Sequence, residues 1–332
     1  MELFAFGLGI GTQNKNQEWL EVFYAEPQLR PGSAEVVELA SALGYKGGNQ
    51  ALAIRDPSAL AKLGAKMGAY ANATRPLVAT FLAVDSAPVS VPECYLKLHL
   101  LSHRMVKPHG VNLAGIFKIL PNVAWTNHGA IDLAELETLR IQARLKGEVI
   151  DVSMVDKFPK MTDYVVPSGV RIADTARVRL GAYVGSGTTV MQEGFINFNA
   201  GTEGPNMIEG RVSSSVWIGA GSDLGGGSST MGVLSGGGTT PISIGKSCLI
   251  GANAGLGIPL GDDCTIESGL YLTAASKVRV LDAQRRPVKT MKAAELTGRS
   301  NLLFRRNSLD GAIECMPNKA AIQLNQDLHS HQ

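Results

Sequence analysis

An aliphatic residue recurs at every sixth position in long runs between Val166 and Val278. A period of six differs from the period of about 3.6 of an α-helix and from the alternation of an ordinary β-strand. It is typical of a parallel β-helix, in which three hexads close one triangular coil of about eighteen residues and each aliphatic residue points inward. The repeating positions, run by run, are Val166, Ile172, Val178, Val184, Val190 and Ile196; Val212, Ile218 and Leu224; Ile244, Ile250 and Leu256; and Leu260, Ile266, Leu272 and Val278.

The places where this period slips are also informative. The irregular spacings are sixteen residues from Ile196 to Val212, twenty from Leu224 to Ile244 and four from Leu256 to Leu260. Insertions in a solenoid leave the coil as loops on one face, often the binding face. We therefore expect loops at 197–211 and 225–243, and both are candidate active-site segments.

Composition excludes several classes of protein. The 332 residues are 45% apolar and 18% charged, as in an ordinary globular protein, and the net charge of +2 favours neither nucleic acid nor an acidic membrane. The apolar segment 4–11 lacks the basic flank of a signal peptide, and no stretch reaches the ~18 apolar residues of a membrane helix. The four cysteines include no C-x-x-C pair, which indicates free thiols and a cytoplasmic location.

The rest of the chain divides around the repeat. We expect an N-terminal α/β domain at 1–110, a connecting segment with a helix at 111–160, the β-helix at 161–280, a C-terminal β extension at 281–320 and a flexible tail at 321–332. The predicted helices are 35–43, 57–71, 92–107 and 132–146, and the predicted strands include 77–84 and 301–307, with a polar turn at 282–287.

Two kinds of chemistry commonly use such a coil, namely zinc-dependent hydration of carbon dioxide and acyl transfer from a CoA thioester. The zinc enzymes need three histidine ligands, and this chain has no histidine between residues 129 and 328, which excludes that class. The base of an acyltransferase would then be a carboxylate or a histidine from the N-terminal part, such as His128. His99 and His103 are four residues apart on a predicted helix, a spacing found in metal sites and, more often, on a packed or solvated helix face.

Glu209 is the leading candidate for the carboxylate, because it lies where the coil resumes after the first slip. One interpretation is a solvated loop glutamate paired to Arg211. The other makes Glu209 a base or nucleophile and Arg211 a clamp for a substrate carboxylate, which suits the planar fork of arginine. The spacing alone favours neither interpretation. Glu193 is a second candidate.

The second predicted loop is rich in glycine, which permits close approach of a ligand to the backbone. It lacks the Lys-Ser/Thr of a phosphate-binding P-loop, so binding of a nucleoside triphosphate is not supported. After the repeat, Lys292, Arg305 and Arg306 supply positive charge that suits the phosphates of CoA, although neighbouring residues of a strand face opposite ways.

Four motifs together resemble the longer branch of the tetrahydrodipicolinate N-succinyltransferases. They are EGFINFNAG at 193–201, IEGR at 208–211, LSGGG at 234–238 and SNLLFRRNS at 300–308, and the resemblance is strong over roughly residues 160–315. It implies a left-handed coil and a homotrimer with active sites between neighbouring subunits. It also implies transfer of succinyl from succinyl-CoA to ring-opened tetrahydrodipicolinate in diaminopimelate and lysine biosynthesis.

The resemblance further implies roles for individual residues. Glu209 matches the family's catalytic glutamate, acting as a base or through an acyl anhydride. The positions that resemble succinyl-CoA contacts are Arg211, Gly226, Ser229, Ala252, Glu267, Ser268, Lys292, Arg305, Arg306, Asn307 and Ser308. No tightly bound cofactor is expected. Some members place Mg²⁺ at the trimer axis with an Asp and a Glu; Glu193 matches the Glu, but Ala176 stands at the Asp position, with Asp174 nearby.

Two other functions remain open at this point. One is a hexapeptide acyltransferase that uses acetyl-CoA on a different amine. The other is a scaffold without enzymatic activity, for which the motif containing Glu209 and Arg211 has no evident use.

Overall fold

The computed structural model describes residues 2–318, which fold into two compact units. Within these residues, the N-terminal unit comprises 2–100, 110–159 and 163–165, and the coil unit comprises 101–109, 160–162 and 166–318. The predicted tail at 321–332 lies outside the described residues. Within residues 2–318, no helix is long and apolar enough to span a bilayer.

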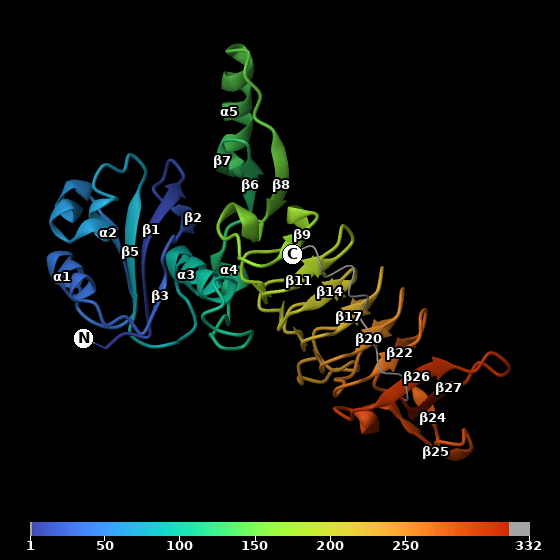
Figure 1. The fold of residues 1–332 in the computed structure, drawn as a ribbon. Coiled ribbons are helices and arrows are strands. Elements are labelled where there is room, and N and C mark those ends of the chain that lie inside the picture. Colours follow the sequence, from blue (N-terminus) through green and yellow to red (C-terminus); the bar gives the residue numbers. More distant parts are fainter. Residues whose placement is uncertain (1, 319–332) are drawn as a thin grey trace. The chain divides into compact units, whose positions relative to one another are not determined.

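The N-terminal unit is built on an antiparallel sheet in the order β2-β1-β5-β4, with β3 added to β1 (Figure 1). The central strand β5 is buried along its whole length, because it has a strand on each side and both of its faces are covered. One face packs against α1 and α2 in an apolar core that includes Phe6, Leu39, Met67 and Phe81. The strands are β1 (Ala5–Gln13), β2 (Trp19–Phe23), β3 (Gln28–Leu29), β4 (Gln50–Ile54) and β5 (Leu77–Leu82), and the helices are α1 (Ala34–Ala42), the 3-10 helix η1 (Pro57–Lys62), α2 (Ala65–Gly68) and α3 (Val91–Ser102).

Two predicted helices differ from the structure. The helix predicted at 57–71 is wrong as one element, because Gly64 takes a left-handed φ of 89° and separates η1 from α2. The helix predicted at 92–107 ends at Ser102, because Arg104 also has a left-handed φ, of 61°. The helix predicted at 35–43 and the strand predicted at 77–84 are present within two residues at each end.

A smaller antiparallel sheet, β7-β6-β8, completes this unit together with α5. The helix predicted at 132–146 is confirmed. Its N-cap is Asp132, whose carboxylate accepts a hydrogen bond of 2.9 Å from the backbone N–H of Ala134. The elements are α4 (Ile116–Ile119), β6 (Val123–Thr126), β7 (Gly129–Asp132), α5 (Leu133–Leu145) and β8 (Val152–Asp156).

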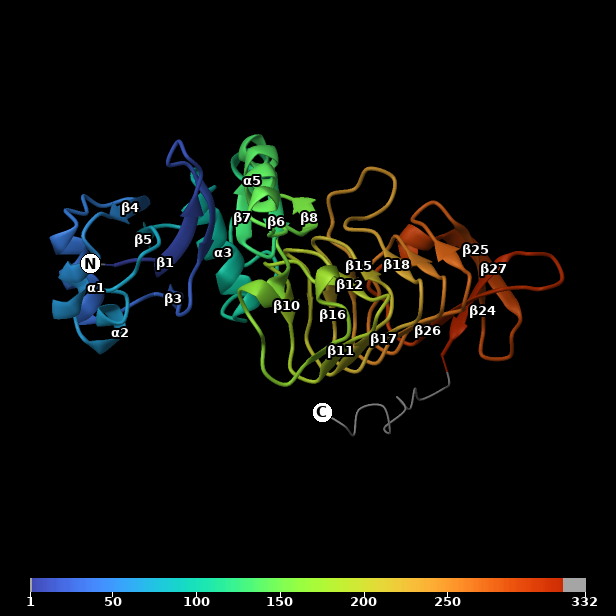
Figure 2. The same ribbon diagram turned by 90° about the horizontal axis from the view of Figure 1, so that it is seen from above.

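The coil unit is a parallel β-helix, as the six-residue period predicts (Figures 1 and 2). Short strands of successive coils pair in parallel and form three long faces, so that Ile208 lies over Leu224 and Leu224 over Ile250. The 3-10 helices η2 (Met161–Asp163) and η3 (Thr175–Arg177) lie near the start of the coil. The coil strands are β9 (Arg171–Ile172), β10 (Tyr183–Val184), β11 (Thr188–Val190), β12 (Phe195–Ile196), β13 (Gly201–Thr202), β14 (Asn206–Ile208), β15 (Arg211–Val212), β16 (Trp217–Ile218), β17 (Asp223–Leu224), β18 (Ser229–Thr230), β19 (Ser243–Ile244), β20 (Leu249–Ile250), β21 (Gly255–Leu256), β22 (Thr265–Ile266) and β23 (Tyr271–Leu272).

The first predicted loop, 197–211, is wrong. Thr202 and Ile208 continue the inward column at the six-residue spacing, and β13 and β14 pair with the coils on both sides. The slip is a shortened corner between Ile208 and Val212. It contains Glu209 and Arg211, which therefore belong to the coil itself.

The second predicted loop, 225–243, begins later than expected. Thr230 is buried at the next inward position, and β18 pairs with β15 and β21, so the insertion occupies 231–242, before β19. One further expectation is wrong at the start of the repeat. Val166 is 77% exposed and does not point into the prism, and the regular column begins at Ile172.

Both ends of the prism are closed by other segments of the coil unit. At the first coil, Ser102 Oγ donates a hydrogen bond of 3.1 Å to the carbonyl of Ala182. At the last coil, a β extension follows, in which β22 pairs with β26. One of its two hairpins encloses the turn predicted at 282–287, and the other encloses a turn at Asp310. The extension consists of β24 (Lys277–Leu281), β25 (Pro287–Lys292), the 3-10 helix η4 (Ala293–Leu296), β26 (Leu302–Arg306) and β27 (Ile313–Pro317).

Candidate active site

Glu209 occupies one corner of the prism, and the same corner is repeated in the following coils. The corner residue directly after each inward aliphatic residue donates a backbone hydrogen bond to a carbonyl oxygen of the next coil. The N–O distance is 2.8 Å from Glu209 to Leu224 and also 2.8 Å from Gly225 to Ile250. The two residues after the inward position are, in order, Glu209 and Gly210, Gly225 and Gly226, Gly251 and Ala252, Glu267 and Ser268, and Arg305 and Arg306. We call this stack the corner row.

Small residues in the corner row are required by backbone contacts. A Cβ atom on Gly225 would lie 2.8 Å from the backbone N of Ala252, and one on Gly251 would lie 2.4 Å from the backbone N of Ser268. These separations are too short for a side chain. The row therefore presents backbone and small side chains over several coils, a surface along which an extended ligand can lie close to the protein.

The carboxylate of Glu209 is half-buried and has no hydrogen-bond or ion-pair partner among residues 2–318. Its Oε2 faces Gly226, at 3.5 Å from the position a Cβ would take there. The surface ion pair considered for Glu209 and Arg211 is not formed, because Arg211 Nε donates instead to Ser229 Oγ at 3.1 Å. A carboxylate without a cation or donor is available to accept a proton from a bound reactant.

A cavity of about 530 Å³ opens beside the shortened corner. It brings together the predicted residues Arg211 and Glu193, which lie on successive coils. It is also lined by residues that sequence reasoning missed, among them Arg177, Phe195 and Ser228. The pairing of β12 with β15, at a sixteen-residue offset, was the signal that could have placed Phe195 beside Arg211. Two guanidinium groups at one cavity favour a ligand with carboxylates.

Ser228 is the most unusual residue of this cavity. Its side chain is 1% exposed, and its hydroxyl has no hydrogen-bond partner within residues 2–318. The hydroxyl lies beneath Gly210, where a Cβ would come to 2.1 Å from Oγ. Because an unpaired buried hydroxyl destabilises a fold, its presence at the cavity suggests that a ligand satisfies it.

The far end of the corner row is basic. Buried Glu314 accepts hydrogen bonds from Arg305 Nη2 at 2.9 Å and from Asn307 Nδ2 at 2.8 Å. Burial by itself raises the pKa of Glu314, but the hydrogen bonds from Asn307 and Arg305 outweigh it and leave the pKa below its usual value. Arg305 and Asn307 are thus held in place by a carboxylate. Arg306, Ser308 and Lys292 are exposed.

The residues considered as metal ligands do not converge. Among residues 2–318, no group of three or more His, Cys, Asp or Glu side chains is placed to hold an ion. Asp174 accepts a hydrogen bond of 3.0 Å from the backbone of Ala176, and Glu193 is exposed. His99 is buried, and its ring nitrogens contact the backbone of Tyr24 and Tyr95, which agrees with a packed helix face.

The fold and this corner define a class, the hexapeptide-repeat acyltransferases. Comparison with known families supports it, since residues 241–274 match the hexapeptide repeat of succinyl-transferase and residues 120–160 match the middle region of tetrahydrodipicolinate N-succinyltransferase. Curated relatives named 2,3,4,5-tetrahydropyridine-2,6-dicarboxylate N-succinyltransferase include those of Pseudomonas paraeruginosa, 63% identical over 99% of this chain and 98% of the relative, and Vibrio cholerae, 57% identical over the full length of both. The chain belongs to the tetrahydrodipicolinate N-succinyltransferase family.

A solved structure supports the same assignment. It comes from Campylobacter jejuni, is assigned as a 2,3,4,5-tetrahydropyridine-2-carboxylate N-succinyltransferase, and superposes with a TM-score of 0.87 at 31% identity, covering 97% of this chain and 94% of that one. The predicted fold class, a left-handed parallel β-helix with an N-terminal α/β domain and a C-terminal β extension, is confirmed. The predicted enzyme class, a CoA-dependent N-succinyltransferase, is confirmed as well.

Proposed function

We propose that Glu209 is the catalytic base in the reaction of this enzyme, the transfer of succinyl from succinyl-CoA to ring-opened tetrahydrodipicolinate in diaminopimelate and lysine biosynthesis. The observation that carries this role is the carboxylate of Glu209, which has no partner among residues 2–318, faces Gly226, and directly precedes Gly210 and Arg211 of the cavity lining. The amino group of the acceptor attacks the thioester carbonyl, the new C–N bond forms and the C–S bond breaks. Glu209 takes the proton lost by the amine, and the CoA thiolate leaves, to be protonated in turn. The products are N-succinyl-2-amino-6-oxopimelate and CoA.

Arg177 and Arg211 provide the recognition of carboxylates in this proposal. Both line the cavity, together with Gly210, the residue after Glu209. The acceptor is a dicarboxylate and the succinyl group carries one further carboxylate, so the reaction brings several negative charges into one site. Arginine binds such groups through its planar fork. The buried hydroxyl of Ser228 forms a hydrogen bond with the same ligands, so that it no longer lacks a partner when they are bound.

The corner row takes the extended part of succinyl-CoA. Gly226, Ala252 and Ser268 present backbone and small side chains along it. Glu267 of the same row accepts a hydrogen bond of 2.7 Å from the backbone N–H of Arg306, and Ser229 accepts one from Arg211. At its basic end, exposed Arg306 and Lys292 bind the phosphates of CoA, and Ser308 donates to them. Arg305 and Asn307 order this segment through Glu314.

The active enzyme is a homotrimer in this proposal, with each site completed by a neighbouring subunit. The cavity supports this, because it is open to one side of the coil, where a second chain has room to supply further contacts. The trimer is tested by light scattering coupled to size-exclusion chromatography of the full chain, and a monomeric active species would contradict it. The free, buried state of Cys94, Cys248, Cys264 and Cys315 supports a cytoplasmic location.

No step is assigned to a metal. The described residues of one chain do not form an ion site, so Mg²⁺ would need Glu193 from several subunits around an axis. Such a site is tested by elemental analysis of the purified trimer and of the Glu193→Gln variant.

The proposed activity is tested by release of CoA from succinyl-CoA in the presence and absence of tetrahydrodipicolinate. We expect release that depends on the acceptor and that is much slower with acetyl-CoA, because polar groups placed for the succinyl carboxylate would then lie unpaired. Acceptor-independent release would contradict the proposal. A higher kcat/KM for acetyl-CoA would favour the alternative acyltransferase.

A further inference from the structure

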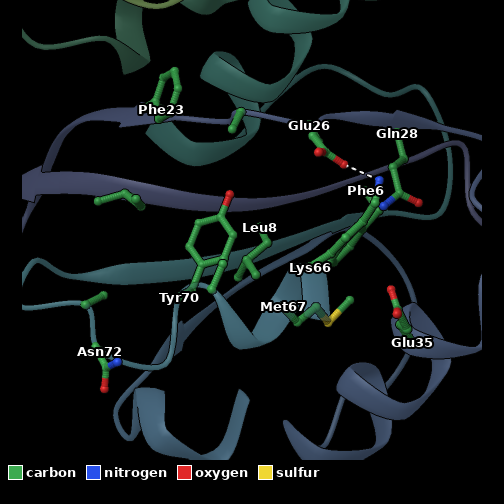
Figure 3. A pocket seen from close by; sticks show the side chains of 14 residues that line it. Phe6, Leu8, Phe23, Glu26, Gln28, Glu35, Lys66, Met67, Tyr70 and Asn72 are labelled. Carbon is green, nitrogen blue, oxygen red and sulfur yellow. Dashed lines mark hydrogen bonds and ion pairs between the residues drawn. The ribbon is translucent and has the colours of Figure 1, made fainter. Parts of the chain in front are cut away.

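The N-terminal unit contains a cavity of its own, of about 530 Å³, which shares no residue with the active site (Figure 3). Its floor consists of Phe6, Leu8 and Ile10, alternate residues of β1 that point to the same face of the sheet. Met67 and Tyr70 form one wall. The volume lies within the range of about 300–1,000 Å³ that is usual for small-molecule sites.

The cavity exists because the helical layer on this face is incomplete. The left-handed turn at Gly64 interrupts the helix that would otherwise continue from η1, and α2 is only four residues long. Phe23 at the end of β2 and the segment after α2, with Tyr70 and Asn72, line the opening instead. The result is an apolar floor reached from solvent.

Charged side chains line the opening of this cavity, above its apolar floor. Lys66 forms an exposed ion pair with Glu26, with 2.6 Å between Nζ and Oε2. Figure 3 shows Glu35 on the other side of Lys66. The carboxylate of Glu35 is half-buried, lies against Gly64, and has no hydrogen-bond or ion-pair partner within residues 2–318. The hydrogen bond to Glu26 and, less strongly, the charge of Glu35 raise the pKa of Lys66.

The charges of these three groups limit the kinds of ligand that the cavity can bind. Two carboxylates and one ammonium give the mouth a net charge of 1 − 2 = −1. A dianion such as the acceptor of the succinyl transfer is repelled there, in contrast to the active site with its two arginines. A ligand that carries one ammonium and one carboxylate next to each other has a partner for both charges.

We propose that this cavity binds a free α-amino acid with an apolar side chain. The side chain lies over Phe6, Leu8 and Ile10, the ammonium group binds Glu35, and the carboxylate binds Lys66. Tyr70, whose hydroxyl has no hydrogen-bond partner in the described part of the chain, stands across the cavity beside Leu8 and closes over the ligand (Figure 3).

The proposal is tested by calorimetric titration of the full-length protein with L-leucine and L-phenylalanine. The comparison ligands are 2-phenylethylamine, which lacks the carboxylate, and 3-phenylpropanoate, which lacks the ammonium group. We expect saturable binding of at least one amino acid, and binding at least about tenfold weaker for the two comparison ligands, because each leaves one charged partner unmatched. Failure of both amino acids to bind would overturn the proposal, as would equal binding of 2-phenylethylamine and L-phenylalanine.

Variants locate the site. Glu35→Gln and Lys66→Met should each weaken amino-acid binding about tenfold or more. Lys62→Met and Glu38→Gln are matched controls, since these exposed residues lie on η1 and α1 but do not line the cavity. Binding that is unaffected by the first pair contradicts the assignment. All four variants should keep the succinyl-transfer activity of the wild type measured without added amino acid, so the outcome is independent of the proposed function.

Discussion

Glu209 has a long side chain at a corner position that is occupied by glycine in the next two coils. Gly225 and Gly251 take the same position in the following coils, and a Cβ at either would meet neighbouring backbone. Glu209 is tolerated because its side chain turns toward Gly226, where space remains. The carboxylate is thereby fixed by the coil and is left without a partner, which suits a group that exchanges a proton.

Replacing Glu209 by Gln should lower kcat by about 10²–10⁴, since the amide keeps the shape of the carboxylate but accepts no proton. KM for succinyl-CoA should change little. Steady-state release of CoA measures both quantities. Glu203→Gln is the control, because Glu203 belongs to the same coils and its carboxylate already accepts a hydrogen bond from the backbone of Ala220. A succinyl adduct on the wild type, seen by intact mass with succinyl-CoA alone and absent from Glu209→Gln, would contradict the base role.

Ser228→Ala should change stability and activity in opposite directions. Removing an unpaired buried hydroxyl should raise the free energy of unfolding by up to about 1 kcal/mol, while kcat/KM falls about tenfold because the ligand loses a donor. Ser222→Ala is the matched control. Ser222 Oγ is also buried but donates to the carbonyl of Gly245 at 2.7 Å, so this variant should be less stable. Urea unfolding and steady-state kinetics measure both effects, and a destabilised Ser228→Ala would refute the interpretation.

At the scale of the element, two threonines inside the prism form a polar pair. Thr202 takes an inward position normally held by an aliphatic residue, and its hydroxyl lies 2.9 Å from that of Thr188. Thr202→Val should destabilise the coil by about 1–2 kcal/mol, because Thr188 then has an unpaired hydroxyl. The double variant with Thr188→Val should recover much of this loss. Equilibrium unfolding of both single variants and the double variant measures the coupling, and simple additivity would contradict it.

The same threonine explains what the sequence could predict about this element. A strict aliphatic period identifies the β-helix and its long faces, but it breaks at Thr202 and Thr230, where a hydroxyl satisfied within the prism replaces a methyl group. The break at Thr202 was interpreted as a loop that the structure does not contain. Glu209 and Arg211 were found because they adjoin a true slip, whereas Ser228 and Arg177 became visible only when the coils were stacked.

At the scale of the whole molecule, stability should respond to pH through Glu21. Burial raises the pKa of Glu21, and the hydrogen bonds from Thr12 and Tyr164 offset this only in part. A carboxyl group whose pKa is raised by folding keeps its proton when the unfolded chain has released it. This group's contribution to stability therefore declines as pH rises from its ordinary value of 4.5 through the raised value.

Glu21→Gln removes this titration. Its stability relative to the wild type should therefore improve as the pH rises above the ordinary carboxyl value of 4.5. Urea unfolding at a series of pH values measures the difference, with the exposed Glu38→Gln as a control that should follow the wild type. A constant difference between Glu21→Gln and the wild type across these pH values would contradict the assignment.

The corner row sets a limit on how this enzyme can vary in length. Solenoids usually tolerate the loss or gain of a whole repeat, since each coil contacts only its neighbours. Here, the coils between Glu209 and Arg306 also fix the separation between the carboxylate and the basic end, at about 4.8 Å for each step. In the proposed mechanism, deleting one of them would leave a closed prism in which the distance between Glu209 and Arg306 no longer matches the length of succinyl-CoA. If the proposed binding mode holds, a coil can be added or lost without loss of activity only outside the interval between Glu209 and Arg306.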